Sequence, residues 1–492
     1  MTFVEYDRKS LQIYQFYDNL FVDHQLSDRS RKCDPVGFNS VYGFFGGEKW
    51  LSQTWPSKVI AIGVTDMKIV RAIVLTAIST VVIAHARPGR TDDFSGSNLK
   101  AVSVKTQVVA DRSTGDVKAC RKMVTGPNVN EHPKYPGCTG FVGWESVMRH
   151  SNGEMLCSFS AGYWHVSFPT PIDLKPDTLK SYQKAGFPVS VDAPTGGRAL
   201  ICRSRDNGQT WTRPTTLVDT PGDDRHPVIV ELSDGTLVCV FFVIDNWYGY
   251  EAPPKGRHKN SRVASIRSTD GGKTWSEPVF MPSPFKYYDR MCGKPVVLPK
   301  GRIVLPTYGK NAWKDSPEQL GVYTSDDFGK SWKFLSRLKS DNGALDEPAV
   351  TRTHDGKLVM IARPDGRIAF SSDKGQSWST PQAFGVKMVA PCLLTLKDGT
   401  VVCIFGWGAT GGIQMMWSDD NGHTWTTPAA DRGFKIDDSV YVYAIGCEMP
   451  DGSIYLVYYD GRGNQNKTAI WSVRVRIRKD RQGIDILPVV DN

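Results

Sequence analysis

The sequence predicts an all-β protein folded as a six-bladed β-propeller. Two interleaved repeats carry this prediction: an eight-residue motif that occurs five times, and a pattern of apolar run, polar turn and apolar run that occurs six times. Residues 100–492 also lack any segment of useful length with helical periodicity. Repeats of this kind indicate an array of similar units, and four-stranded units placed around an axis form a propeller.

The eight-residue motif is Ser-x-Asp-x-Gly-x-Thr/Ser-Trp. Its Ser and Asp side chains can hydrogen-bond nearby backbone N–H groups, its Gly can adopt positive φ, and its Trp can pack into the layer below. Each copy therefore predicts a turn that closes a β-hairpin, and we expect its Asp to hold the loop and not to catalyse. The five copies span residues 204–211, 268–275, 325–332, 371–378 and 418–425.

The second repeat predicts a tight hairpin of two strands at each copy. Its turn glycines are Gly153, Gly235, Gly301, Gly356, Gly399 and Gly452. Each of the first five hairpins is followed by a copy of the eight-residue motif, so two hairpins together make one blade. The sixth ends in the β-rich run 468–478 without that motif. We expect a strand within 101–110 to close the ring.

The segment 67–86 has the three parts of a secretory signal peptide in their usual order. Lys68 and Arg71 form a basic start, residues 72–83 form an apolar run, and residues 84–86 are a small-x-small cleavage site. The run is short for a transmembrane helix, and a buried strand or signal anchor is the alternative. We therefore expect residues 1–66 to be a non-native upstream extension and residues 87–492 to form a single propeller domain. The protein would be secreted or periplasmic, with no stable membrane insertion.

The composition narrows the class of partner. The chain has 492 residues and a net charge of +9, spread without a Lys/Arg run that would suit nucleic acid. An acidic glycan or small molecule is the better expectation, and we expect a monomer. The ten Cys lack CxxC spacing and no His/Asp cluster has ligand spacing, so the sequence predicts neither a metal nor a cofactor.

The eight-residue motif resembles the Asp-box, or BNR repeat, of the sialidase (neuraminidase) superfamily. The resemblance extends over about residues 100–478 and implies a propeller with five Asp-box hairpins. It specifies activity less closely, because Asp-boxes also occur in lyases, other glycosidases and non-enzymatic binding proteins.

The resemblance implies that a site is built from the starts of the innermost strands and the ends of the second strands. The position nine residues before each turn glycine marks the start of an inner strand. These positions are occupied by Trp144, His226, Cys292, Glu347, Ala390 and Tyr443. Such a ring of aromatic, basic and acidic groups exceeds what a purely structural role would require.

Three catalytic assignments follow from the resemblance, each at a position that matches the family pattern. Tyr443 resembles the nucleophilic tyrosine, and Glu347 resembles the glutamate that activates it. Asp192, twelve residues before the first Asp-box serine, is a weaker match to the general acid. A tyrosine has a pKa near 10 and is a poor nucleophile alone, so a neighbouring carboxylate that takes its proton makes chemical sense.

The substrate-binding pattern departs from the family. Arg363, sixteen residues after Glu347, resembles one of three arginines that grip the substrate carboxylate. The stretch 141–146 and the region near Gly411 lack the other two. Arg225 and Arg290 could substitute for them. The remaining candidates for contact with the sugar are His226, Glu145, His165 and Trp407.

Three functions remain open. The first is a secreted, retaining exo-glycosidase of sialidase type that removes a terminal, acidic sugar through Tyr443 and Glu347. The second is a polysaccharide lyase, or a glycosidase of different specificity, in which His226 or His165 acts with Tyr443, Arg225 and Arg290 on a uronate. The third is a glycan-binding propeller without catalysis.

Overall fold

The computed structural model describes residues 100–126, 129–130, 141–162, 197–220, 222–244, 261–311, 317–340, 343–406, 411–438, 443–460 and 468–489. The chain divides into two compact units, 1–87 and 88–492, and every described residue lies in the second. The predicted upstream extension and signal peptide therefore lie outside the described residues. Among those that are described, there is no helix with the length and apolar character needed to cross a membrane.

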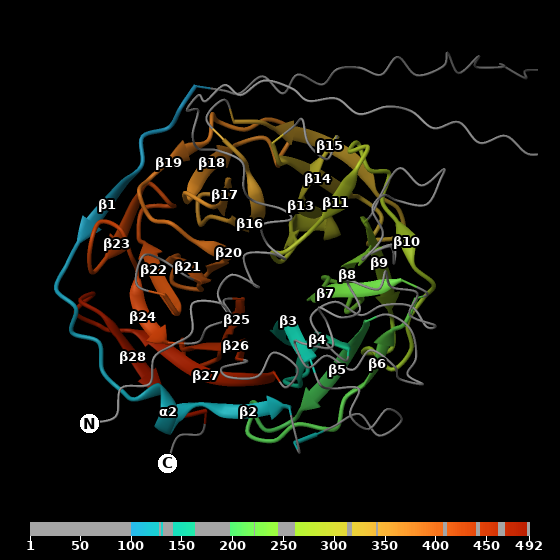
Figure 1. Ribbon diagram of the computed structural model, residues 1–492, viewed down its shortest axis with the longest axis horizontal. Helices are drawn as coiled ribbons and strands as arrows, with labels where there is room; N and C mark the ends of the chain where they lie inside the picture. Colours follow the sequence, from blue (N-terminus) through green and yellow to red (C-terminus); the bar gives the residue numbers. More distant parts are fainter. Residues whose placement is uncertain are drawn as a thin grey trace, which may run out of the picture. The chain divides into compact units, whose positions relative to one another are not determined.

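The described part of the second unit consists of five hydrogen-bonded β-sheets placed around a common axis, with one short α-helix, α2 (Val117–Cys120), and one 3-10 turn, η1 (Pro299–Gly301) (Figure 1). The all-β class and the propeller-like arrangement predicted from the repeats are thus confirmed. The first sheet contains β3 (Phe141–Arg149), β4 (Met155–Gly162), β5 (Arg198–Ser204) and β6 (Thr215–Val218). The four-stranded sheet farther along the chain contains β16 (Asp346–Arg352), β17 (Leu358–Arg363), β18 (Arg367–Ser371) and β19 (Gln382–Ala383).

Two further sheets include strands from the beginning of the described chain. The six-stranded sheet contains β20 (Val389–Thr395), β21 (Val401–Gly406), β22 (Ile413–Ser418), β23 (Thr424–Thr427), β24 (Phe434–Asp437) and β1 (Lys105–Val108). The five-stranded sheet contains β25 (Ala444–Glu448), β26 (Ile454–Asp460), β27 (Ala469–Ile477), β28 (Ile484–Leu487) and β2 (Lys122–Thr125).

The fifth sheet has nine strands and spans two sets of hairpins. Its strands are β7 (Asp223–Glu231), β8 (Leu237–Ile244), β9 (Ser261–Ser268), β10 (Val279–Phe280), β11 (Tyr288–Arg290), β12 (Val296–Val297), β13 (Ile303–Lys310), β14 (Gln319–Ser325) and β15 (Lys333–Leu338). β11 pairs with β13 over three residues but with β9 only at Tyr288↔Ser261. The hydrogen-bonded sheets number five, so the count of six blades stays a prediction.

The five Asp-box turns have the predicted hydrogen bonds. In the first copy, Ser204 Oγ accepts from Gly208 N at 2.8 Å and donates to Asp206 Oδ1 at 2.7 Å. Asp206 Oδ1 also accepts from Thr210 N at 2.9 Å. The same Ser–Gly and Ser–Asp bonds occur in the other four copies. These carboxylates are used within their own turns, which agrees with a structural role.

The strand expected within 101–110 does form, but at a different place. β1 pairs in parallel with β23, at the outer edge of the six-stranded sheet. The strands that pair with β27 on its side away from β26 are instead β2, at Ile470–Ser472, and β28, at Arg474–Ile477. The expectation that 101–110 closes the ring is therefore wrong. The first part of β27 is covered by 122–125 and the second part by β28, so the backbone groups of β27 are paired on this side.

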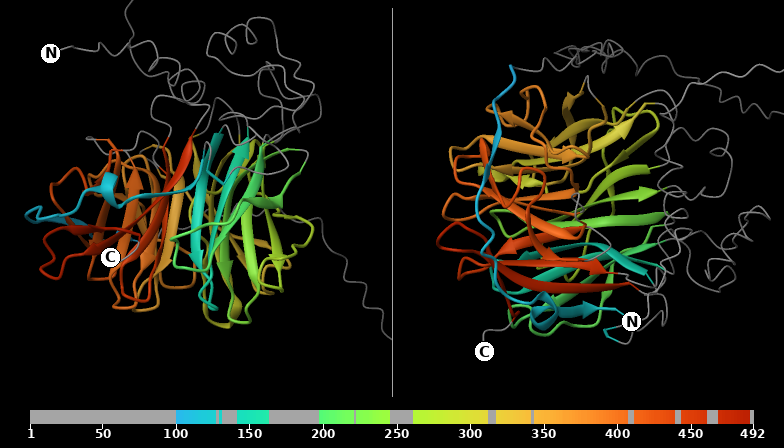
Figure 2. Two further views of the ribbon diagram at one scale, coloured as in Figure 1. Left: turned by 90° about the horizontal axis from the view of Figure 1, so that it is seen from below. Right: turned by 60° about the vertical axis from the view of Figure 1, so that its left-hand side comes forward.

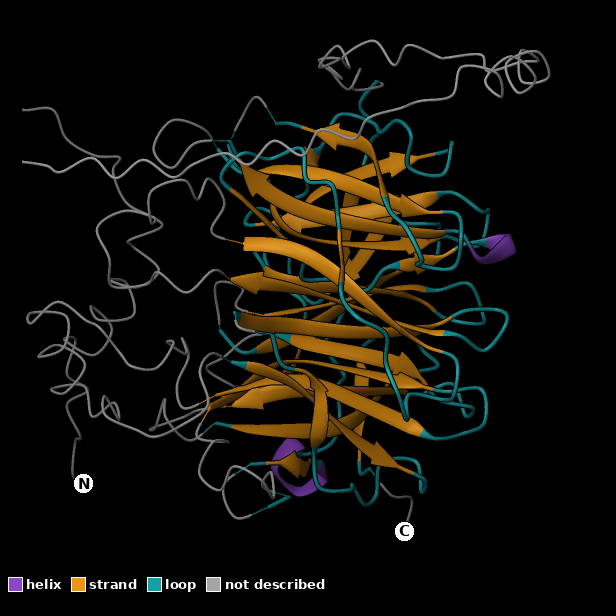
Figure 3. Ribbon diagram, turned by 90° about the vertical axis from the view of Figure 1, so that its right-hand side faces the viewer, coloured by secondary structure: helices purple, strands orange, loops and turns teal. Residues whose placement is uncertain are grey.

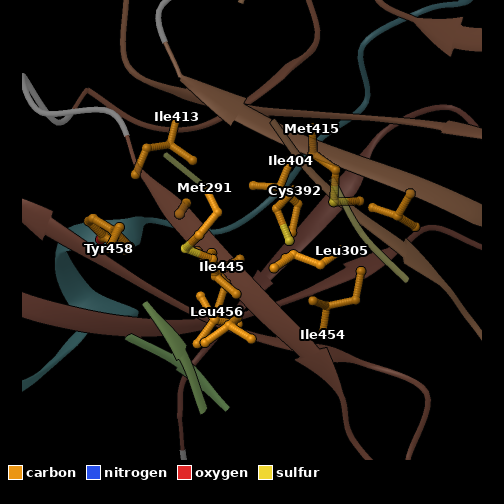
Figure 4. Packing of buried hydrophobic residues seen from close by; sticks show 14 of the residues in the cluster. Met291, Leu305, Cys392, Ile404, Ile413, Met415, Ile445, Ile454, Leu456 and Tyr458 are labelled. Atoms are coloured by element: carbon orange, nitrogen blue, oxygen red, sulfur yellow. The ribbon is translucent and has the colours of Figure 1, made fainter. Parts of the chain in front are cut away.

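The sheets pack face to face through continuous apolar layers. The largest cluster combines side chains from β8, β13, β21 and β26, among them Leu305, Ile404 and Leu456 (Figure 4). The inner strands β3, β7, β16, β20 and β25 lie nearest the axis, where β3 contacts β7 and β25, and β20 contacts β16 and β25 (Figure 1). Because the strands run between two faces of the ring, inner-strand starts and second-strand ends share one face (Figures 2 and 3).

Candidate active site

Four inner strands begin with the same unusual backbone conformation. Trp144, His226, Glu347 and Ala390 have φ values of 51°, 53°, 41° and 44°, in the left-handed region that side chains rarely adopt. A shift in strand register occurs beside each of them in β3, β7, β16 and β20. These are β-bulges, which re-aim side chains and concentrate near active sites. The nine-residue spacing therefore marks a structural repeat at the face where we expected the site.

Tyr443 and Glu347 form the centre of the site. The Tyr443 hydroxyl donates a hydrogen bond of 2.5 Å to Glu347 Oε1. Glu347 Oε2 accepts from the backbone N–H of Ala390 at 3.1 Å and lies 3.1 Å from Arg363 Nη1. The bulge in β16 and the start of β25 thus bring together two residues that are 96 positions apart in the chain. This is the contact expected of a tyrosine nucleophile and its activating base.

Asp346 is a member of the site that the sequence analysis missed. Its Oδ2 accepts hydrogen bonds from Arg363 Nε at 3.0 Å and from Nη2 at 2.8 Å, and its Oδ1 accepts from Glu347 N at 2.8 Å. The only available signal was its place directly before Glu347 in the sequence. Arg363 therefore joins two adjacent carboxylates of its own sheet.

The protonation of the pair suits proton transfer near neutral pH. Burial raises the pKa of Glu347 to about 7, against the opposing effect of Arg363, and Asp346 raises it further. Burial and the nearby charge of Glu347 raise the pKa of Tyr443 well above its usual range. The proton consequently rests on the tyrosine, and a carboxylate with a pKa near the operating pH is an effective general base.

Two aromatic rings also pack against Tyr443. The His226 ring meets the Tyr443 ring edge-on at 4.9 Å between centroids, and Tyr459 stacks on Tyr443 at 6.1 Å. Trp144 contacts both His226 and Tyr459. Burial lowers the pKa of His226 to about 3, so the imidazole is neutral. Tyr459, in the second strand of the last hairpin, was also missed by the sequence analysis.

The two candidate arginines lie in the same neighbourhood, and both have partners. Arg225 forms an ion pair with Asp223, with Nε at 2.9 Å and Nη2 at 2.5 Å, and its guanidinium lies 4.5 Å from the centroid of Trp144. Arg290 Nε donates to Ser261 Oγ at 3.0 Å, and its guanidinium lies over a tyrosine ring of β11. The charges of both arginines lower the pKa of His226. Both guanidinium groups therefore lie close to the aromatic rings around Tyr443.

Glu145 is buried, and the hydrogen bonds of the described residues leave both its carboxylate oxygens without a partner. Burial raises its pKa to about 8, so the group is mostly protonated at neutral pH. It lies near Cys157, whose pKa it raises, and no hydrogen bond or ion pair found in the described chain joins it to Tyr443 or Glu347.

Three predicted site residues lie outside the described residues: Asp192, His165 and Trp407. Within the parts that the structure describes, no group of three or more His, Cys, Asp or Glu side chains has the geometry to hold a metal ion. The structure therefore brings together Tyr443, Glu347 and Arg363, and the missed Asp346.

Comparison with known proteins places these features in a family. The profile described as "BNR repeat-like domain" matches residues 195–456, more than half of the chain. The sialidase of Micromonospora viridifaciens is 26% identical over 331 residues, which cover 58% of this chain and 48% of that protein. The chain thus spans about half the length of this relative.

Solved structures share the fold at low sequence identity. A protein of unknown function from Dyadobacter fermentans superposes with a TM-score of 0.54 at 19% identity, over 72% of this chain and 97% of that one. A mutant of the NanB sialidase from Streptococcus pneumoniae superposes with a TM-score of 0.50 at 14% identity, over 71% and 70%. Both support the propeller-like architecture.

Proposed function

Because the chain belongs to the family of BNR repeat-like domains, within the sialidase superfamily, we propose that it is a sialidase-like glycosidase that acts with retention. The observation that carries this proposal is the 2.5 Å hydrogen bond from the Tyr443 hydroxyl to Glu347. A non-catalytic lectin has no need of a half-buried tyrosine held against a carboxylate whose pKa is near 7.

The proposed reaction has two steps. In the first, the Tyr443 oxygen attacks the anomeric carbon, its proton passes to Glu347, and the leaving oxygen receives a proton from a general acid. In the second, water attacks the same carbon, the tyrosine oxygen leaves and recovers its proton from Glu347, and the general acid takes the water's proton. Two inversions give net retention. Asp192 remains our proposal for the general acid.

The proposal can be tested with the full chain and a panel of fluorogenic aryl glycosides. Tyr443→Phe should lower release by a factor of about 10³ or more, because it removes the nucleophile. Tyr455→Phe is the matched control, since Tyr455 is a fully buried tyrosine of the same hairpin that donates its hydroxyl to Gly208 O, within the protein core. Nuclear magnetic resonance of the first-formed anomer should show retention. Release by Tyr443→Phe at the wild-type rate would refute the assignment.

A second candidate is supported by the position of His226. A neutral imidazole edge-on to Tyr443 is also what a polysaccharide lyase would use to remove a proton beside a uronate carboxyl group. A lyase forms an unsaturated uronate that absorbs ultraviolet light. Appearance of this absorbance from uronate polymers, lost in His226→Ala, would favour the lyase over the hydrolase.

We also propose that residues 67–86 direct secretion and are removed after Ala86. Support comes from the order of basic start, apolar run and small-x-small site in the sequence. Expression of the full chain in a host with an export pathway should give an exported protein with Arg87 at its N-terminus. Mass spectrometry of the intact exported protein tests this, and a retained N-terminus would contradict it.

The nine-stranded sheet supports a count of six blades. We propose that β7–β10 form one blade and β12–β15 another, because only one residue pair of β11 and β9 connects them. Each set includes an Asp-box turn, at 268–275 and 325–332. An experimental structure with six separately twisted sheets around the axis would confirm the count.

A further inference from the structure

The guanidinium of Arg363 is committed to carboxylates of its own chain. Nε and Nη2 donate to Asp346, and Nη1 lies 3.1 Å from Glu347. When Glu347 is ionised, these three side chains carry two negative charges and one positive charge. Arg363 occupies the position at which the resemblance places a receptor for a substrate carboxylate. Because Asp346 and Glu347 neutralise its charge, the Arg363 guanidinium has no surplus positive charge with which to attract a substrate carboxylate.

The other two places where the resemblance puts arginines offer no cation. The strand 141–146 presents Trp144, and the arginine stacked near it, Arg225, is ion-paired with Asp223. At the second place the chain has Gly411, which carries no side chain, and Gly412 beside it approaches the backbone oxygen of Asp437 closely. The described residues at this place, 411–418, therefore present no arginine side chain.

Aromatic side chains from β7 and β26 pack against the Tyr443 ring. The His226 and Tyr459 rings contact the Tyr443 ring at 4.9 and 6.1 Å between centroids, and Trp144 packs in turn against His226 and Tyr459. A sugar carboxylate placed here would add a further negative charge beside Asp346 and Glu347. Among the described residues, the nearby arginines already have partners, because Arg225 pairs with Asp223 and Arg290 donates to Ser261, so little would offset the desolvation of the carboxylate. An uncharged sugar ring avoids both penalties.

We propose that the sugar unit bound at Tyr443 is uncharged, and that Arg363 is a positioning residue for Glu347 and not a carboxylate receptor. This inference rests on the proposed glycosidase function and departs from the acidic sugar expected from the sequence. The net charge of +9 still suits an acidic polymer, because long-range attraction and recognition of the cleaved unit are separate effects.

A matched pair of ligands tests the charge preference of the full-chain protein. The pair is the 2,3-unsaturated analogue of sialic acid and its methyl ester, which have nearly the same shape but differ by one negative charge. We expect the ester to bind at least as tightly as the acid, or the acid not to bind at all. Binding of the acid about tenfold or more tighter than the ester, by titration calorimetry, would overturn the inference.

Asp346→Asn provides the second measurement. Removal of this negative charge frees the Arg363 fork, so affinity for the acid should rise about tenfold while affinity for the ester changes little. The control is Asp365→Asn. Asp365 lies two residues after Arg363 in the chain, and its exposed carboxylate is 3.6 Å from the guanidinium of Arg367. An Asp346→Asn variant that melts like the wild type but gains no affinity for the acid would also overturn the inference.

Hydrolysis separates this inference from the proposed function. Release of an uncharged sugar that is lost in Tyr443→Phe supports both. Release of sialic acid or a uronic acid that is lost in Tyr443→Phe upholds the glycosidase but overturns the uncharged sugar. Release that persists in Tyr443→Phe refutes the nucleophile, and the acid–ester comparison then decides the charge preference independently.

Discussion

Replacement of Arg363 by Met tests the electrostatic role of the Asp346–Arg363–Glu347 group. Arg363 is the strongest influence that opposes the effect of burial on Glu347, whose pKa is about 7. An opposite charge this close lowers the pKa of a carboxyl group by about 1–3 units, so its removal should raise the pKa of Glu347 to about 8–10. Less of the general base would then be ionised at neutral pH.

The magnitude follows from the fraction of Glu347 that is ionised. At pH 7 this fraction is about one half for a pKa of about 7, and it falls about 5-fold for a pKa of 8 and about 500-fold for a pKa of 10. The value of kcat/KM at pH 7 should fall by a factor in this range and recover as the pH rises. The sign is that of a base, because activity needs the deprotonated carboxylate.

The assay is the pH profile of kcat/KM for the best aryl glycoside, with the wild type, Arg363→Met and a control. Arg367→Met is the control, because Arg367 lies on the neighbouring strand β18 and pairs with the exposed Asp365. Circular dichroism melting confirms folding. The reasoning is refuted if Arg363→Met loses activity equally at every pH while its acid limb stays at the wild-type position, which would indicate a direct role in substrate binding.

Three stability predictions follow from other parts of the molecule. Glu145→Gln should stabilise the protein increasingly as pH rises from about 5 to 8, by up to about 5 kcal/mol. The reason is that burial raises the pKa of Glu145 from 4.5 to about 8, so that ionisation of this group disfavours the folded state. A gain in stability that does not depend on pH would contradict this. Asp420→Ala should lower the free energy of unfolding by about 1–3 kcal/mol, because the hydrogen bonds of the turn are lost. The pKa of Asp420 is lowered in the folded protein, so the difference in stability between wild type and variant should shrink as the pH falls below about 4. Urea unfolding at pH 7 and pH 3 checks both expectations. Gly412→Ala should destabilise the protein far more than Gly411→Ala, since both have positive φ but only at Gly412 would a Cβ meet backbone, at Asp437 O; equal melting temperatures would refute the close approach.

The Asp-box turns could be predicted because their interactions are local. Ser204, Asp206 and Gly208 lie within five positions, so the motif itself contains the donors and acceptors that close the turn. The nine-residue spacing had a similar basis, since it measures an inner strand from its bulge to its turn. It identified Glu347 and Tyr443 as candidates, and the structure places their side chains in contact.

The partners of Arg363 and the covering of the last sheet could not be predicted in the same way. A guanidinium can face a substrate or a neighbouring carboxylate, and the choice depends on how the β16 bulge orients Asp346 and Glu347. Likewise 101–110 and 122–125 both have strand-like sequences, but it is the second that pairs with the first part of β27. The assignments to Asp192, His165 and Trp407 stay predictions.

The sequence by itself determined the all-β class, the repeating turns and the residue types gathered at the starts of the inner strands. These properties depend on hydrogen bonds within a few residues and on the alternation of apolar side chains along strands. The tertiary structure decided which of those residues meet. Contacts between Tyr443 and Glu347, or between Arg363 and Asp346, form only when separate strands are brought to one face of the ring, because burial and orientation there set both their hydrogen bonds and their charges.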